Sequence, residues 1–195
     1  VLYGQGGQKL PQQPHLLVPV LMMSFAKIVV LGNDGVGRRH LLNKILGIRD
    51  SIKLDSPREL YSTASDRYQA VSFFCVGNHQ VFRGAGEFNG RMNQLRNADC
   101  ILLCFSPEKP ESFHDLVNAW LPRIAVVGAS APIIVACCKS DLRKNATDLE
   151  RQGVRLVDED ICAEIVGTRF RGLEIKDYIE CSALENENVD EVLQA

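Results

Sequence analysis

A glycine-rich segment near the start of the chain is the first part of the sequence whose residue types could do chemistry. It follows a short β-branched run at residues 26–31 and has the spacing Gly-x-x-x-x-Gly. This spacing is typical of a phosphate-binding loop, in which glycines let backbone N–H groups turn inward and a helix N-terminus adds partial positive charge. The residues expected to line this anion site are Gly32, Asp34, Gly35, Val36, Gly37, Arg38 and Arg39.

Two residues of this loop depart from the usual pattern. A phosphate-binding loop has Lys after its last glycine and then Ser or Thr, and here both positions are Arg. The spacing alone also fits an ordinary glycine-rich turn between a strand and a helix. The chemistry of the loop therefore depends on what the rest of the chain supplies.

The composition is that of one compact globular domain. Of 195 residues, 46% are hydrophobic and 24% are charged, which excludes a disordered or fibrous chain. The net charge of -2 gives no basic field, so we expect no binding to nucleic acid. The seven cysteines lie mostly in apolar runs and form no Cys-x-x-Cys pair. We expect them to be reduced and buried, and the protein to be cytoplasmic.

Residues 1–23 are expected to lie outside the folded domain. They contain a Gly- and Gln-rich stretch, and the apolar run at residues 16–25 is too short to span a bilayer. Met23 stands just before the first strand, which suggests that the residues before it are an extension, disordered or non-native. We expect one domain over residues 24–195, with a truncated last helix.

The rest of the chain alternates between strand and helix patterns. Apolar positions predict strands at 26–31, 67–76, 80–82, 100–105, 132–138 and 178–181, and helices at 38–46, 111–127, 158–166 and from 187. The pair Gly77-Asn78 favours a hairpin between the strands on either side of it. Continuous apolar runs such as 100–105 indicate strands buried on both faces. This order predicts an α/β fold with a mostly parallel sheet, helices on both faces and ligands at the carboxyl ends of its strands.

Several runs in the second half carry a resemblance to a known family. They are Cys104-Phe105-Ser106, Trp120-Leu121-Pro122, Cys138-Lys139-Ser140-Asp141-Leu142-Arg143 and Tyr178-Ile179-Glu180-Cys181-Ser182-Ala183-Leu184. Together with the glycine loop, these runs make the chain from about residue 26 resemble the Rho branch of the Ras-like small GTPases. The resemblance implies a Ras-like P-loop fold with a six-stranded sheet, and residues 145–157 are similar to the Rho-type insert helix.

The resemblance implies a guanine-nucleotide site with GTP or GDP as ligand. In such a site Asp141 accepts two hydrogen bonds from guanine, the stem of Lys139 covers the base, and the Ala183 N–H meets the ring carbonyl. Ser182 and Leu184 belong to the same base-binding loop. The alternative is that Asp141 and Lys139 are a solvated pair on a loop.

The residues that hold Mg²⁺ in this family are replaced here. Arg38 stands where the family has a phosphate-bridging Lys, Arg39 where a hydroxyl binds the metal, and Arg83 where a carboxylate supports it. No metal ligand is expected, and two readings stay open. In one, Arg39 and Arg83 supply the lost charge and clamp the phosphates. In the other, the site is empty and the arginines pair with carboxylates, namely Asp34, Glu87 and Glu185.

Hydrolysis by the family's mechanism is not expected. Glu87 holds the place of the Gln that orients the attacking water, and Asp34 holds a loop position that is normally Gly. Both carboxylates would be repelled by a triphosphate. Gly86 can still offer an N–H to a γ-phosphate, and Thr63 is the nearest candidate for the threonine of switch I. No catalytic residue is intact.

Two functions of different class follow. The first is a Rho-like protein that binds guanine nucleotide, hydrolyses it poorly or not at all, and acts through protein contacts with effectors. The second is a nucleotide-free pseudo-GTPase that serves as a structural or interaction subunit of a larger assembly. Contact with a membrane is left open, because this sequence stops within the final helix and does not show whether the family's lipidated cysteine motif is present.

Overall fold

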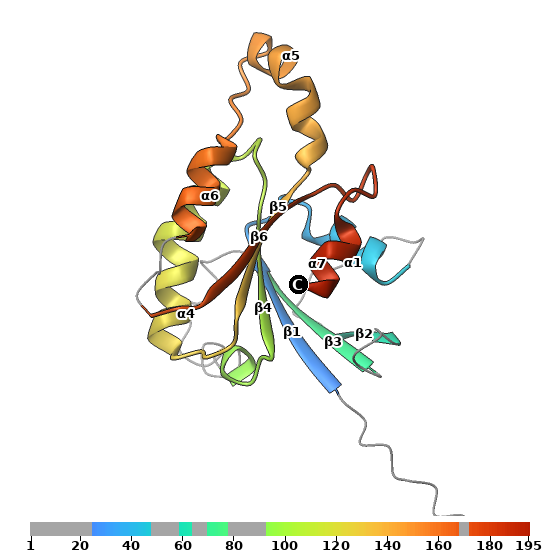
Figure 1. Ribbon diagram of the computed structural model, residues 1–195, viewed down its shortest axis with the longest axis vertical. Coiled ribbons are helices and arrows are strands. Elements are labelled where there is room, and N and C mark those ends of the chain that lie inside the picture. The colour runs from blue at the N-terminus through green and yellow to red at the C-terminus, as the bar shows by residue number, and fades with distance from the viewer. Residues whose placement is uncertain (1–24, 48–58, 64–69, 78–92, 168–171) are drawn as a thin grey trace, which may run out of the picture.

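One mixed sheet forms the centre of the molecule. The computed structural model describes residues 25–47, 59–63, 70–77, 93–167 and 172–195. Its six strands lie in the order β2-β3-β1-β4-β5-β6, and every neighbouring pair is parallel except β2 and β3. The expectation of a mostly parallel sheet is confirmed (Figure 1). The strands are β1 (Phe25–Gly32), β2 (Glu59–Thr63), β3 (Ala70–Gly77), β4 (Cys100–Phe105), β5 (Ile133–Cys138) and β6 (Ile175–Cys181).

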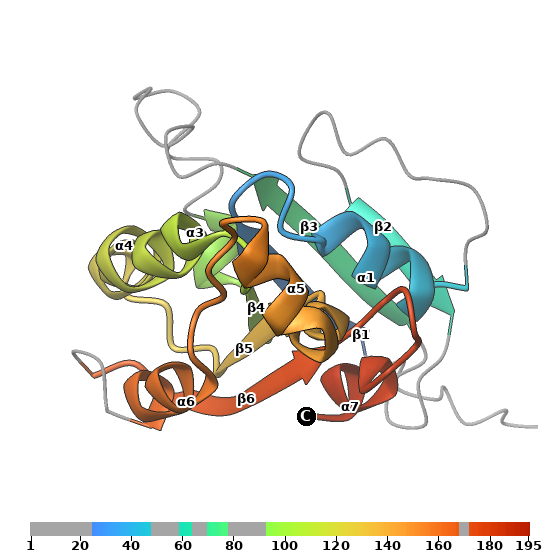
Figure 2. The same cartoon turned by 90° about the horizontal axis from the view of Figure 1, so that it is seen from above.

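Helices cover both faces of this sheet. In Figure 2, α3, α4 and α6 lie on one side of the strands, and α1 and α7 lie on the other. This arrangement confirms the predicted α/β layering. The helical elements are α1 (Arg38–Ile45), α3 (Pro110–Asp115), η2 (Leu116–Trp120), α4 (Leu121–Val127), η3 (Ser140–Asn145), α5 (Ala146–Arg151), α6 (Glu159–Gly167) and α7 (Val189–Gln194).

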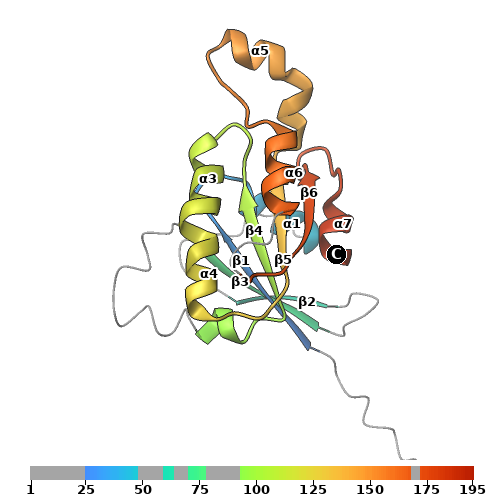
Figure 3. The ribbon, with the colours of Figure 1, turned by 60° about the vertical axis from the view of Figure 1, so that its left-hand side comes forward.

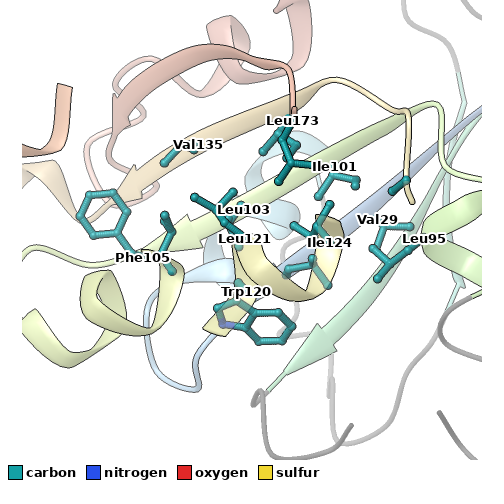
Figure 4. Packing of buried hydrophobic residues seen from close by; sticks show 14 of the residues in the cluster. Val29, Leu95, Ile101, Leu103, Phe105, Trp120, Leu121, Ile124, Val135 and Leu173 are labelled. Atoms are coloured by element: carbon teal, nitrogen blue, oxygen red, sulfur yellow. The ribbon is translucent and has the colours of Figure 1, made fainter. Parts of the chain in front are cut away.

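The core is divided into two layers by the central strands. Successive residues of β4 alternate between them: Ile101, Leu103 and Phe105 join one cluster, and Leu102 and Cys104 join the other. This alternation follows from the strand period of two, and it explains why the run is apolar at every position. The first cluster packs under α3, η2 and α4, and Figure 4 shows its side chains, with the fully buried Trp120 at one edge of the group.

The segment from residue 110 to 127 forms continuous helix, as its apolar stripe predicts. It begins with Pro110 in the first turn, where a missing N–H costs nothing, and ends at Gly128, whose φ of 70° closes the helix. Its middle turn, η2, is a π-helical turn. No helix among the residues that the structure describes is long and apolar enough to cross a membrane.

Two expectations about strands need correction. The antiparallel partner of β3 is β2, with Glu59 opposite Phe74 and Thr63 opposite Ala70, and the sequence pattern did not indicate this strand. The predicted partner at 80–82 lies outside the described residues, as does the extension at 1–23. Strand β6 begins at Ile175, three residues before the predicted start.

The residues that resemble a Rho-type insert form a projection at one end of the sheet. Of residues 145–157, the first ends η3 and the next six form α5, and Figure 3 shows α5 extending beyond the end at which β4 and β6 finish. That is the carboxyl end of the parallel strands, where the glycine loop and the base-binding motif also lie. The segments expected to form the nucleotide site therefore lie together at the carboxyl end of the parallel strands.

Candidate nucleotide site

The glycine loop connects β1 to α1 in a conformation that needs glycine. Gly32 has a φ of 142°, and a Cβ there would lie 2.3 Å from the Cys104 carbonyl oxygen in the neighbouring strand. Gly37 has a φ of 113°, and a Cβ there would lie 3.0 Å from the Cys138 Cβ. Positions 32 and 37 therefore have no room for a side chain, because the loop passes close to β4 and β5 there. The loop keeps the tight backbone path that lets N–H groups point at an anion.

Asn33 ties this loop to the helical segment beside it. The Asn33 Nδ2 donates to Asp115 Oδ2 at 2.7 Å, and the buried Trp120 donates its Nε1–H to Asn33 Oδ1 at 3.1 Å. A buried indole N–H needs such an acceptor. The indole thus reaches from the hydrophobic core to the loop, and this bond could not be predicted from the sequence because its partners are 87 positions apart.

The charged groups of the loop are already partly paired with each other. Arg38 Nη2 lies 2.9 Å from Asp34 Oδ1, and the Arg38 side chain is 11% exposed whereas that of Asp34 is 75% exposed. Asp34 is the loop's carboxylate, and the residue after Arg38 is a second arginine, Arg39. Guanidinium groups offer donors and no lone pairs, whereas Mg²⁺ takes oxygen ligands. The residues of this loop therefore do not fit Mg²⁺.

A pocket of about 560 Å³ opens beside the loop, between α1 and the segments that follow β5 and β6. Most of the base-binding residues expected from sequence meet here, since Lys139, Asp141, Ala183 and Leu184 all line it. The first turns of α1 form the opposite wall. The lining residues are Gly37, His40, Leu41, Asn43, Lys44, Cys138, Lys139, Asp141, Cys181, Ala183 and Leu184.

Asp141 is held in place by Ser182, the remaining residue of the predicted base-binding set. The buried Ser182 hydroxyl donates to Asp141 Oδ1 at 2.6 Å and accepts from the Glu185 N–H at 3.1 Å. Ser182 and Glu187 also exchange backbone hydrogen bonds, which fold the loop after β6 back on itself. One carboxylate is thereby fixed at the pocket wall, rather than left as a solvated group on a mobile side chain.

Lys139 connects the two halves of the site. Its backbone has a φ of 63°, and its Cγ and Cε lie 3.6 and 3.8 Å from the position that a Cβ at Gly37 would take. The lysine stem therefore lies along the glycine loop. Its ammonium forms an ion pair with Glu108, in the loop between β4 and α3. The segments expected to bind the base and the phosphates are thus in direct contact.

Two uncharged thiols, those of Cys138 and Cys181, form part of the pocket wall. Cys138 and Cys181 lie side by side in β5 and β6. A hydrogen bond with the Cys104 thiol, together with burial, holds the pKa of Cys138 well above its usual value. Contact with the Cys138 thiol and burial do the same to the pKa of Cys181. Both remain neutral at pH 7, which leaves an apolar surface suited to the flat face of a base.

A second polar network supports this edge from behind. Arg143 donates from Nε and Nη2 to the Glu180 carboxylate at 2.7 and 2.6 Å, and from Nη1 to the Val157 carbonyl at 2.6 Å. The Tyr178 hydroxyl donates to Glu180 Oε1 at 2.6 Å. Burial, followed by the nearby Cys137 and Glu180, raises the pKa of Tyr178, so its hydroxyl keeps the proton it donates. Arg143 thus joins η3 to β6 and to the start of the chain leading into α6.

Some of the predicted site residues do not meet the loop. Thr63 pairs with Ala70, which in turn lies opposite Phe25, at the far end of β1 from Gly32. The structure therefore does not bring the switch I candidate to the phosphate loop. The predicted positions Arg83, Gly86 and Glu87 lie outside the described residues.

Sequence reasoning missed several residues that the structure brings to the site. Lys109 reaches the glycine loop from the start of α3, and its Nζ donates to the Asp34 carbonyl oxygen at 3.3 Å. His40 and Lys44 line the pocket from α1. The α1 residues carried a usable signal, because they face away from the buried pair Leu41 and Leu42 on the same helix.

Comparison with known proteins places the chain in a family. The sequence model of the Ras family matches residues 63–195. The Rho-related GTP-binding protein RhoD of Homo sapiens is 30% identical over 177 residues, which cover 86% of this chain and 79% of that protein. The Rho-related protein racN of Dictyostelium discoideum is 30% identical over 178 residues, covering 85% and 71%. RhoB of Homo sapiens is 27% identical over 175 residues, covering 86% and 85%. Fold, site geometry and these relatives agree that the chain belongs to the Rho branch of the Ras family of small GTPases.

Proposed function

We propose that this protein binds guanine nucleotide, hydrolyses it very slowly or not at all, and acts in the cytoplasm through contacts with other proteins. The observation that carries the proposal is the contrast between the two halves of the site. Asp141 is fixed by Ser182 at the wall of a pocket of suitable size. The glycine loop beside it keeps its shape but has lost the residues that would hold a catalytic metal.

The base-binding half supports guanine as the ligand. A carboxylate at the pocket wall can accept from the ring N–H and the amine of guanine, whereas adenine would present lone pairs to it. The stem of Lys139 and the neutral thiols supply apolar surface for the faces of the ring. GTP and GDP share this base, so the pocket itself does not distinguish between them.

The phosphate-binding half supports binding without turnover. Phosphoryl transfer depends on a metal that neutralises charge on the phosphates and on a residue that orients water. Asp34 adds a negative charge where the triphosphate must pass, and Arg39 replaces the hydroxyl that would bind the metal. With Glu87 in place of the water-orienting Gln, the sequence has lost both the metal ligands and the residue that positions the attacking water.

One observation favours the second candidate, a nucleotide-free scaffold. The Arg38 guanidinium, which stands where the family has its phosphate-binding lysine, is paired with Asp34 within the loop itself. A site whose cation is neutralised internally attracts phosphate less strongly. In this case the fold would serve only to present protein-binding surfaces.

Nucleotide content and nucleotide binding together test the proposal. The purified protein is denatured and its supernatant is analysed by ion-pair chromatography, and calorimetry then measures GDP and ADP binding. We expect guanine nucleotide in the supernatant or GDP binding at micromolar concentration, with weaker binding by Asp141→Asn and unchanged binding by the exposed control Asp148→Asn. Absence of nucleotide, with a GDP Kd weaker than about 1 mM, would support the scaffold instead.

A further inference from the structure

Lys109 places a positive charge over the glycine loop from a different part of the chain. It precedes α3, and its Nζ lies 3.3 Å from the Asp34 carbonyl oxygen and 2.6 Å from where a Cβ at Gly35 would be. We propose that Lys109 is a phosphate-binding residue that takes over, from the loop between β4 and α3, the charge that Mg²⁺ supplies in related proteins. This inference rests on the proposed function, because it assigns a ligand to the phosphates of the bound nucleotide.

The backbone of Lys109 is fixed by Ser112. The Ser112 hydroxyl donates to the Lys109 carbonyl at 2.6 Å, the Ser112 N–H donates to the same oxygen at 2.8 Å, and the Lys109 N–H donates to the Ser106 carbonyl at 3.1 Å. Ser112 is 2% exposed. The lysine therefore extends from an anchored turn, which lowers the entropy lost when its ammonium is positioned on a ligand.

The Lys109 ammonium lies against the glycine loop at Gly35, 2.6 Å from where a Cβ of this residue would be. Gly35 has a φ of 76°, and any larger residue there would place its Cβ against the lysine ammonium. The backbone N–H groups of a phosphate-binding loop face the space around such a glycine. Lys109 Nζ thus lies against the same stretch of loop that would hold the phosphates.

The ammonium has hydrogen-bonding capacity left for a ligand. A lysine carries three N–H donors, and one of them is donated to the Asp34 carbonyl. That interaction is made with a neutral oxygen, so the positive charge is not cancelled by it. Arg38 differs, because its charge is paired with the Asp34 carboxylate. Of these two cations, Lys109 is the one whose charge remains available to phosphate.

The neighbouring residue couples this contact to the base-binding half. Glu108 forms an ion pair with Lys139, whose stem lies along Gly37. One short turn after β4 therefore contacts both halves of the site. This turn would therefore contact a bound nucleotide in two ways. Lys109 would bind the phosphates directly, and Glu108 would position Lys139, whose stem covers the base.

Calorimetry in EDTA with guanosine and GDP as probes tests this assignment. Guanosine reports on the pocket, and the difference between the two ligands reports on the phosphates. We expect Lys109→Gln to lower GDP affinity by about ten- to hundredfold, as loss of a hydrogen bond to a charged group does, and to leave guanosine affinity unchanged. Lys109→Arg should retain most of the GDP affinity. The control is Arg151→Gln on α5, which removes the same charge at an exposed position.

Three results would overturn the assignment, and they are distinguishable from failure of the proposed function. GDP binding by Lys109→Gln and Lys109→Met that equals that of the unmodified protein excludes a phosphate contact. An equal loss of guanosine and GDP binding shows that Lys109 shapes the pocket instead. If Arg151→Gln lowers GDP affinity as much as Lys109→Gln does, the loss is due to the change in net charge and not to a contact of Lys109 with phosphate. If the unmodified protein binds neither guanosine nor GDP, the proposed function itself fails, and the assignment fails with it.

Discussion

Asp34 is the residue that most directly opposes phosphate binding. Its carboxylate neutralises Arg38 and would stand close to the phosphates, yet its backbone carbonyl is what Lys109 contacts. Asp34→Gly removes the charge and keeps the carbonyl. We expect GDP affinity to rise about five- to tenfold, since a phosphate would then replace the carboxylate as the partner of Arg38.

Calorimetry of GDP binding measures this effect, and Asp34→Asn is the matched control for size. Asparagine keeps the bulk without the charge, so it should reproduce most of the gain. If Asp34→Gly binds GDP no better than the unmodified protein, the pair with Arg38 does not compete with the ligand.

Base selectivity is expected to depend on the fixed carboxylate of Asp141. In Asp141→Asn the amide NH₂ would face the guanine amine and N–H, or the side chain would turn away from Ser182, and each outcome loses hydrogen bonds. We expect the preference for GDP over ADP to fall about ten- to hundredfold. Ser182→Ala should cause a smaller loss, because it frees Asp141 without removing it.

Competition between GDP and ADP for the same protein measures this selectivity. Equal affinities for GDP and ADP in the unmodified protein would mean that the pocket does not read guanine through Asp141.

At the scale of the elements, Arg143 joins three parts of the chain that are distant in sequence. Its side chain is 20% exposed and that of Glu180 is 16% exposed, so removing the guanidinium leaves a nearly buried carboxylate without its main partner. We expect Arg143→Met to lower the free energy of unfolding by about 3 kcal/mol. Arg151→Met on the exposed surface of α5 should change it by less than about 0.5 kcal/mol.

Urea unfolding followed by circular dichroism compares these two variants. A loss in Arg143→Met no larger than in Arg151→Met would mean that the network does not stabilise the link between η3 and β6.

Elements with long, regular patterns could be predicted from the sequence, and short ones could not. The stripe over 111–127 predicted the helix that α3, η2 and α4 form, because many apolar positions repeat with the helical period. Strand β2 has five residues, Glu-Leu-Tyr-Ser-Thr, with no continuous apolar run, and among the described strands it lies at the edge of the sheet, next to β3. Its existence depends on the edge that β3 offers rather than on its own residues.

In the candidate site, too, some residues could be predicted from the sequence and others could not. Asp141, Ser182 and Lys139 lie in motifs whose order along the chain predicts their meeting. Lys109 belongs to no motif, and Asn33 fills a position of the glycine loop that the motif leaves unspecified; their contacts span 75 and 82 or more positions. Those contacts exist because β1 and β4 are neighbours in the sheet, so that the loop after one strand lies against the turn after the other. Such residues are found only when the strand order is known.

For the whole molecule, the charge arrangement predicts very slow turnover. We expect single-turnover GTP hydrolysis at or below the slow intrinsic rate of small GTPases, on the order of 10⁻⁴ per second. Labelled GTP and chromatography of the product measure this rate. Glu87→Gln alone should not restore activity, because the metal-binding groups would still be missing. Clearly faster hydrolysis by the unmodified protein would show that another group activates water.

The dependence on Mg²⁺ follows from the same charges and involves the whole nucleotide site. In related proteins the metal neutralises the phosphates, so that chelation weakens nucleotide binding. Here Arg39 stands where the metal's hydroxyl ligand would be, and Lys109 lies over the glycine loop, so we expect cations of the chain itself to neutralise the phosphates. We expect GDP affinity in EDTA and in millimolar Mg²⁺ to agree within about twofold.

Replacing the two arginines by the residue types that hold Mg²⁺ in the family tests this prediction further. Arg39→Ser or Arg83→Asp alone should weaken GDP binding, because each removes a positive charge and neither rebuilds a complete metal site. The double variant should recover part of the affinity in Mg²⁺ but not in EDTA, since a hydroxyl and a carboxylate together suit the metal. A strong dependence on Mg²⁺ in the unmodified protein would mean that a divalent cation binds despite the arginines, and that neither they nor Lys109 replace it.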